Sequence, residues 1–226
     1  KLFENYPVDG IILIGTMITA EHKKFLKGSK VPVVVIGQYT KHANCIYHDD
    51  YGAGKAMGRL AASLNQASGG GHIAYIRVTR EDKSAGAARE DGFRAGLKSA
   101  GIELSGDYVR LSEFRTESGY NAALSLLEEK PDIDIISCAT DTIAAGAIEA
   151  LHVFEKHAPN SRRVTVTGFG DNQLLKAVTG GIPTIHFGYK TSGIRGAELL
   201  LDVIERGEKI PVEIKLGFRL VNGEEE

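Results

Sequence analysis

The chain has 226 residues, enough to bury a substantial core in one or two lobes. Its 42% hydrophobic and 25% charged residues are ordinary for a globular protein. A net charge of −2 excludes nucleic-acid binding that depends on bulk charge alone. No apolar run approaches the roughly 20 residues that a membrane-spanning helix needs.

Strand and helix patterns alternate along the whole sequence. Short apolar runs bounded by glycine or polar residues predict strands at residues 9–15, 31–37, 44–49, 71–78, 107–112, 133–139, 162–170 and 182–188. Helical spacing with glycine or proline stops predicts helices at residues 19–29, 50–66, 85–101, 117–130, 141–157, 172–180 and 191–208. Residues 212–221 close the chain in β alternation. We therefore predict an α/β fold of parallel sheets with helices on both faces.

The polar pair Thr140–Asp141 stands between a buried strand and an alanine-rich helix. Ligands of parallel sheets bind beyond the carboxyl ends of the strands, which is where this pair lies. Asp141 can cap the helix by accepting backbone N–H bonds, and Thr140 would then point into a ligand crevice. The alternative is that the pair serves only as a cap.

Other predicted strand ends carry aromatic, amide and charged side chains. The segments after the strands include Gln38, Tyr47, Phe114, Phe187 and Tyr189. Aromatic rings stack on the apolar faces of a sugar, while amide and charged groups bind its hydroxyls. This concentration at strand ends favours a sugar ligand, although any one aromatic is more often part of a core.

Catalytic and metal-binding motifs are absent from the sequence. There is no GxSxG elbow, no phosphate loop and no HExxH, and the histidines show no ligand spacing with cysteines. Cys45 and Cys138 stand inside apolar runs and are typical of small buried residues in a reducing cytoplasm. We expect no enzyme activity, no metal and no cofactor.

Several segments together resemble one protein family. The stretches "AAREDGFRAGL", "ISCATDTIAAGAIEAL" and "VTVTGFGDNQLLKAVTGGIPTIHFGYKTSG" are similar to the effector-binding core of lactose/galactose-repressor-type bacterial transcription regulators. The resemblance covers nearly the whole chain and is strongest to sucrose- or trehalose-operon repressors. It implies two α/β lobes, joined by three crossovers, that close on a small effector. The expected lobes are residues 1–46 with 189–211, and 47–188 with 212–226.

The resemblance also implies site residues. The pocket arginine of the family falls on Arg89, whose guanidinium would clamp vicinal hydroxyls or a phosphate. The polar residue before Asp141 falls on Thr140, where asparagine is more usual. The remaining positions that carry over are all aromatic: Tyr47, Phe114, Phe187 and Tyr189.

Two acidic positions of the family are replaced here. One falls on Gly170, which Asp171 and Asn172 follow, and the other falls on Gly37, which Gln38 follows. Glycine makes room and removes negative charge, so the departures favour a disaccharide or a sugar phosphate. The candidate phosphate partners are Arg80, Lys83, Arg89 and Arg115.

Members of the family begin with a helix-turn-helix DNA-binding headpiece, and this sequence shows none. The first two strand–helix units of the first lobe are also not found, so we expect the intact protein to be longer. The resemblance implies a cytoplasmic homodimer that binds operator DNA through the headpiece. The alternatives are a periplasmic-type sugar-binding protein and, with less support, an α/β enzyme that acts on a sugar or nucleotide.

Overall fold

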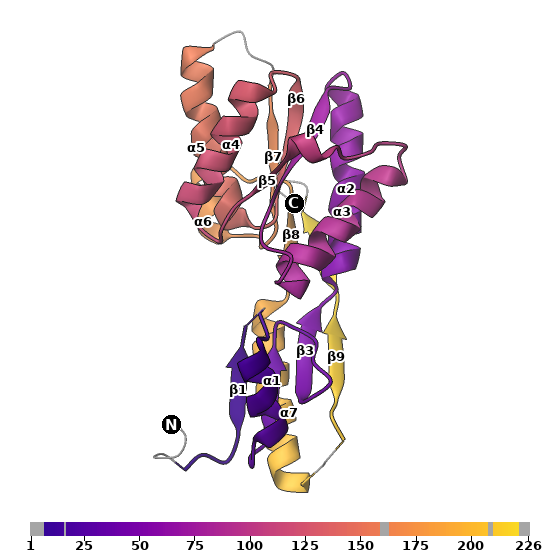
Figure 1. Cartoon of the computed structure of the whole chain (residues 1–226), viewed down its shortest axis with the longest axis vertical. Coiled ribbons are helices and arrows are strands. Elements are labelled where there is room, and N and C mark those ends of the chain that lie inside the picture. Colours follow the sequence, from indigo (N-terminus) through magenta and orange to yellow (C-terminus); the bar gives the residue numbers. More distant parts are fainter. Residues whose placement is uncertain (1–6, 16, 159–162, 208–209, 222–226) are drawn as a thin grey trace. The chain divides into compact units, whose positions relative to one another are not determined.

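The computed structural model describes residues 7–15, 17–158, 163–207 and 210–221. The chain divides into two compact units (Figure 1). The first unit comprises Lys1–Asp49 and Gly188–Gly217, and the second comprises Asp50–Phe187 and Phe218–Glu226. The chain therefore passes from one unit to the other three times, as the family resemblance implies.

The first unit is a parallel sheet between two helices. Its strands are β1 (Ile11–Ile14), β2 (Val33–Ile36), β3 (Asn44–His48) and β9 (Glu213–Leu216), in the order β1-β2-β3-β9. The helices are α1 (Ala20–Gly28) and α7 (Tyr189–Arg206). Val33 and Val35 pack with Leu26 of α1, whereas Val34 and Ile36 face Gly196 of α7. Because successive side chains of a strand point to opposite faces, α1 and α7 cover opposite faces of the sheet.

The second unit has a larger parallel sheet. Its strands are β4 (His72–Arg77), β5 (Val109–Leu111), β6 (Ile133–Cys138) and β7 (Thr165–Thr167), in the order β5-β4-β6-β7. A separate antiparallel pair joins β8 (Thr184–Phe187) to β10 (Phe218–Val221). The helices are α2 (Asp50–Ala67), α3 (Arg89–Lys98), α4 (Thr116–Glu129), α5 (Asp141–His157) and α6 (Gln173–Thr179), with the short helices η1 (Lys83–Ala88) and η2 (Gly106–Tyr108). In Figure 1, α2 and α3 lie on one side of the sheet and α4 and α5 on the other.

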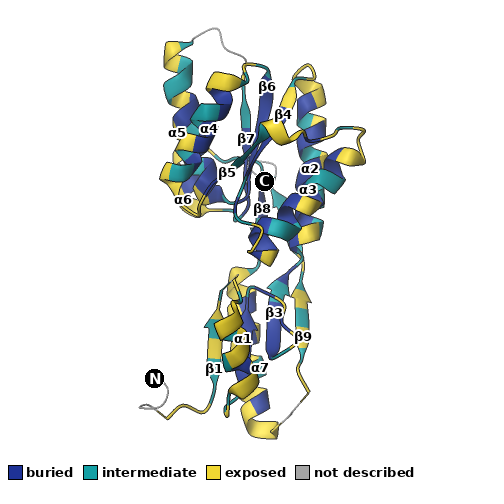
Figure 2. Ribbon diagram, viewed as in Figure 1, coloured by how far each residue is buried: buried dark blue, intermediate teal, exposed yellow. Residues whose placement is uncertain are grey.

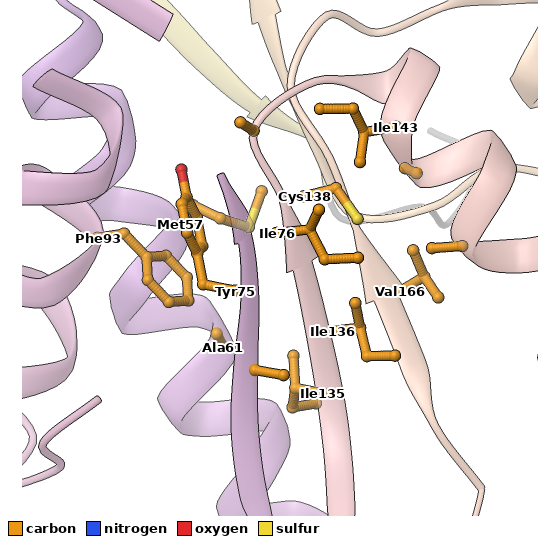
Figure 3. Close-up of a cluster of buried hydrophobic side chains, with 14 of the residues drawn as sticks. Met57, Ala61, Tyr75, Ile76, Phe93, Ile135, Ile136, Cys138, Ile143 and Val166 are labelled. Carbon is orange, nitrogen blue, oxygen red and sulfur yellow. The ribbon is translucent and has the colours of Figure 1, made fainter. Parts of the chain in front are cut away.

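The main core fills both faces of this second sheet; β6 is buried along its length and β4 is buried except at its two ends (Figure 2). Figure 3 shows Tyr75 of β4 pointing toward Met57 and Phe93, and its neighbour Ile76 pointing away from them. The rings of Tyr75 and Phe93 are 4.8 Å apart between centroids. A strand that is buried on both faces, as β6 is, needs such helical layers on either side.

The structure differs from the sequence-based expectations in three places. Residues 212–221 form two strands rather than one, because β9 joins β3 in the first unit and β10 joins β8 in the second. The unit boundaries also differ from those expected. The first unit, and not the second, contains Tyr47–Asp49, Gly188 and residues 212–217. The helix expected at residues 85–101 begins as the π-helix η1 and continues as α3.

Candidate functional site

Arg89 lies at the centre of a buried polar cluster in the second unit. Its side chain is 7% exposed. Its Nε donates to Asp50 Oδ1 over 2.8 Å, and its Nη1 donates to the carbonyl of Ala139 over 2.7 Å. The guanidinium carbon lies 5.2 Å from the ring centre of Phe169 and 4.9 Å from that of Phe187. We call these residues the arginine cluster: Arg89, Asp50, Ala139, Phe169 and Phe187.

Two members of the arginine cluster lie where parallel strands end. Ala139 follows β6 and Phe169 lies two residues beyond β7, whereas Phe187 is the last residue of β8, in the antiparallel pair. The carboxyl ends of parallel strands form the usual ligand edge of such a sheet. A planar guanidinium and aromatic rings are groups that sugar sites use, and here Arg89, Phe169 and Phe187 are all buried, at 7%, 2% and 1% exposure.

The short helix η1, which ends directly before Arg89, sets the position of this residue. Asp82 caps η1, because its Oδ1 accepts from the N–H groups of Ser84 (2.9 Å) and Ala85 (2.8 Å). A Cβ on Gly86 would come within 1.9 Å of the carbonyl oxygen of Thr79, so only glycine permits this close approach. Single π-turns inside helices are frequent at functional sites, which fits the position of Arg89 directly after this one.

Burying the charged pair of Arg89 and Asp50 is costly. Two ions that leave water lose hydration, and their attraction repays this only when the geometry is good and the remaining polar atoms are bonded. An apolar pair of similar volume would stabilise such a core at least as well. Stability alone therefore does not account for the buried pair, and a role of Arg89 in ligand binding stays a prediction.

Thr140, and not Asp141, caps helix α5. Thr140 is the N-cap of α5, and its hydroxyl accepts from the N–H of Ile143 over 3.3 Å. Asp141 is 4% exposed and accepts from the N–H of Asn172 (2.7 Å) and the hydroxyl of Thr184 (2.7 Å). The expectation that Asp141 is the cap was wrong, because its carboxylate accepts hydrogen bonds from two distant segments instead. The expectation that Thr140 faces a ligand stays a prediction.

Burial raises the pKa of the Asp141 carboxyl. The hydrogen bonds from Asn172 and Thr184 lower this pKa, as does the charge of Arg89, while the nearby carboxylate of Asp171 raises it. Asp171 in turn bonds His186, with 2.8 Å between its Oδ2 and the histidine Nδ1. The cavity beside this network measures about 20 Å³, which holds one water molecule and not a sugar.

Glycine is required around Asp141 for steric reasons. A Cβ on Gly168 would lie 2.2 Å from Asp141 Oδ1, and one on Gly170 would lie 3.3 Å from Oδ2. Gly170 also has a φ of 141°, which side chains rarely adopt. Local packing and backbone conformation therefore explain why residue 170 is glycine. That Gly170 also makes room for a larger ligand stays a prediction.

Strand-end residues of the first unit form their own contacts. Gln38 is buried, and its Oε1 accepts from the N–H of Ile18 over 3.2 Å. The Tyr47 hydroxyl donates to Glu213, and burial raises the pKa of this tyrosine. Tyr189, the first residue of α7, is 54% exposed, and its ring meets that of His48 edge-on at 5.4 Å.

Comparison with known proteins identifies the family. Residues 1–219 match the family described as periplasmic binding proteins and sugar binding domain of LacI family. The chain belongs to this family. The expected resemblance to lactose/galactose-repressor-type regulators is thereby confirmed.

Individual relatives agree with this assignment. The sucrose operon repressor of Staphylococcus xylosus is 28% identical over 222 residues, which cover 96% of this chain and 66% of the repressor. The transcriptional regulator CelR of Thermobifida fusca is 26% identical over 95% of this chain and 62% of its own. A structure of a CelR–cellobiose complex has a TM-score of 0.81 and 25% identity, and covers 97% of this chain and 66% of that one. The chain thus spans about two thirds of the length of these relatives.

Within this LacI-family fold, the predicted phosphate partners are largely engaged by the protein. Arg80 pairs with Glu90 (3.1 Å) and Asp91 (2.9 Å), and Arg115 pairs with Glu113. Lys83 donates to the carbonyl of Arg80 over 3.3 Å. Phe114 is 44% exposed. None of these contacts excludes a ligand, but the arginines would have to exchange a carboxylate for it.

The structure thus brings Arg89, Phe187 and Asp141 to one region of the second unit, and it adds residues that the sequence-based set omitted. These are Asp50, at the start of a predicted helix, and Phe169, at the end of a predicted strand. An aspartate at the start of a helix was the signal in the sequence for Asp50. It does not reveal the ion pair, because the arginine partner lies 39 positions away. No group of three metal-ligating side chains gathers among the described residues, and none of the described helices is long and apolar enough to cross a membrane.

Proposed function

We propose that this chain is the effector-binding core of a sugar-responsive transcription regulator, acting as the repressor of a sugar-utilisation operon. The family match and the similarity to a sucrose operon repressor support this function. The observation that carries it is the arginine cluster, a buried guanidinium between two rings at the ligand edge of the sheet.

The favoured effector is a disaccharide. The similar proteins are named for sucrose and for a complex with cellobiose, which are both disaccharides. A sugar phosphate is the second candidate, and it has less support because Arg80 and Arg115 have carboxylate partners. Arg89 would donate to sugar hydroxyls, and Phe187 would present its ring to the sugar. Gln38, Tyr47 and Tyr189 stay candidate contacts contributed by the first unit.

The parent protein would be a cytoplasmic homodimer that binds operator DNA through a headpiece outside this chain. Helix α6 offers one surface for the dimer, since Leu174 and Val178 lie one turn apart on it and are 74% and 72% exposed. Exposed apolar side chains grouped in this way are typical of association surfaces. Sugar and operator affinities would be reciprocally coupled.

The test is calorimetric titration of the full-length protein with sucrose, trehalose, cellobiose, their 6-phosphates and common hexoses. We expect one disaccharide to bind tightly and to be recovered unchanged. Recovery of a cleaved or modified sugar would instead establish an enzyme. A periplasmic-type binding protein, the other alternative, would bind the sugar without any effect of that sugar on DNA binding. No binding across the panel would contradict the proposal.

A further inference from the structure

The chain passes between its two units at three points, which we call the crossings. The first lies between Asp49 and Asp50, the second between Phe187 and Gly188, and the third between Gly217 and Phe218. On the side of the second unit, the crossings therefore end at Asp50, Phe187 and Phe218. The contacts that connect these three residues lie within the second unit.

One guanidinium connects the second-unit ends of the crossings. Arg89 Nε donates to Asp50 Oδ1 over 2.8 Å, and its guanidinium carbon lies 4.9 Å from the ring centre of Phe187. Phe187, the last residue of β8, is paired in the antiparallel ladder with Phe218, the first residue of β10. Phe187 is 1% exposed, and Phe218 packs against the same main core. Arg89 is thus linked to all three crossings, to the third one through Phe187.

The first unit holds its own ends of the crossings by other contacts. The N–H of Asp49 donates to the carbonyl of Leu216 over 2.9 Å, and its carboxylate pairs with Lys215 over 2.8 Å, which joins the first crossing to the third. The rings of His48 and Tyr189 meet edge-on, which joins the first crossing to the second. The second unit differs, because a buried charge connects its crossings, and this charge belongs to the residue proposed to bind the effector.

The ion pair at the first crossing is sensitive to any change in its surroundings. Arg89 and Asp50 are 7% and 6% exposed, so salt and water screen their interaction little. A charge that loses its partner in such a buried place strongly destabilises the protein. An effector that accepts hydrogen bonds from the guanidinium would therefore either reinforce the pair or replace Asp50 outright. Both changes alter how firmly the first crossing is held.

We propose that Asp50 is a positioning residue that couples effector binding to operator binding through the crossings. This inference rests on the proposed function and names the route of its regulation. Asp50 acts through Arg89 on the first crossing, while Phe187 and Phe218 carry the change to the second and third. The coupling is reciprocal, so operator DNA changes the sugar affinity by the same factor as the sugar changes the operator affinity.

The test measures the coupling factor of the full-length protein, which is the ratio of its operator dissociation constants with and without the sugar that binds best. Fluorescence anisotropy gives these constants, and calorimetry gives the sugar affinity. Asp50→Asn keeps an acceptor for Arg89 but removes the charge, and we expect it to bind the sugar with a coupling factor at least about fivefold smaller. Asp49→Asn is the matched control. It removes the neighbouring charge, whose partner Lys215 is half exposed, and should keep the wild-type factor.

A second pair of variants tests the far end of the route. Phe218→Ala should lower the coupling factor while the sugar affinity stays within about threefold of the wild type, because Phe218 is linked to Arg89 through Phe187. Leu220→Ala is its control, since Leu220 packs against the same core from the same strand but lies two residues beyond the crossing. We expect this control to keep the wild-type factor.

Three results would overturn the inference. The first is a wild-type coupling factor in Asp50→Asn, even with a lower free energy of unfolding, since Asp50 would then have a structural role alone. The second is an equal loss of coupling in Asp50→Asn and Asp49→Asn, and the third is an equal loss in Phe218→Ala and Leu220→Ala. A wild type whose operator affinity responds to no sugar would be distinguishable from these, because it contradicts the proposed function itself and this inference with it.

Discussion

At the scale of single residues, Thr140 shows how one hydroxyl fixes the start of a helix. It is the N-cap of α5 and bonds the N–H of Ile143. Thr140→Ala should lower the free energy of unfolding by about 1 kcal/mol, since the orphan N–H loses its acceptor. Thr140→Ser keeps the acceptor and should stay close to the wild type. Urea unfolding of the three proteins measures this, and equal losses for alanine and serine would show that the methyl group, not the cap, matters.

Asp141 should make stability depend on pH. Burial raises its pKa in the folded state, so the unfolded chain ionises this carboxyl first as pH rises. Relative to Asp141→Asn, the wild type should lose stability as pH rises above about 4, the ordinary carboxyl value, until the raised pKa is passed. Urea unfolding of both proteins across this range gives the difference. Parallel curves would mean that the folded-state pKa of Asp141 is not raised.

The sequence could locate these two residues but not assign their tasks. Threonine and aspartate are both good N-caps, so local preference does not decide between them. Asn172 and Thr184, which lie 31 and 43 positions further along the chain, donate hydrogen bonds to the Asp141 carboxylate and so leave the cap to Thr140. The family resemblance points to Arg89 as a site residue, which stays a prediction. Asp50 and Phe169, the partners of Arg89, were not predicted, because the contacts are long-range.

At the scale of elements, glycines let α2 and α3 approach closely. A Cβ on Gly58 would lie 2.2 Å from the carbonyl oxygen of Phe93, and one on Gly96 would lie 2.3 Å from that of Lys55. Since backbone meets backbone here, no side chain can move aside to make room. The position of Arg89 at the start of α3 depends on this packing.

Gly58→Ala should therefore destabilise the protein by about 1–3 kcal/mol, the usual cost of overpacking a close contact. Gly28→Ala is the control, because a Cβ at Gly28 meets nothing within 4 Å. It should leave the free energy of unfolding unchanged or slightly higher, since alanine favours helix. Chemical denaturation compares the two, and a harmless Gly58→Ala would contradict the close packing.

Local patterns predicted the elements well where one strand or helix occupies one apolar or periodic run. Helix α5 spans residues 141–157, as expected from its spacing. The prediction of a single strand at residues 212–221 was wrong. The β alternation continues across Gly217, but the two halves of this segment pair with strands of different units. Pairing partners are set by the fold, and no pattern within residues 212–221 reveals them.

At the scale of the whole molecule, the proposed dimer depends on exposed apolar residues of α6. Leu174→Glu should raise the dimer dissociation constant by more than about tenfold, because a charge replaces a buried apolar contact. Gln173→Glu adds the same charge to a neighbouring polar position and should have little effect. Sedimentation velocity of the full-length variants measures the dissociation constant. A Leu174→Glu protein as dimeric as the wild type would exclude α6 from the interface.

Arg89 is proposed to recognise the effector, and a comparison of two arginines of α3 tests this. Arg94, like Arg89, bonds a carboxylate and a carbonyl, those of Glu90 and Leu104. Lysine at either position keeps the positive charge beside the carboxylate but loses the planar fork. We would titrate the full-length wild type, Arg89→Lys and Arg94→Lys with the sugar that binds best. We expect Arg89→Lys to weaken binding by at least about tenfold and Arg94→Lys to leave it unchanged. Equal affinities for all three proteins would contradict this role of Arg89.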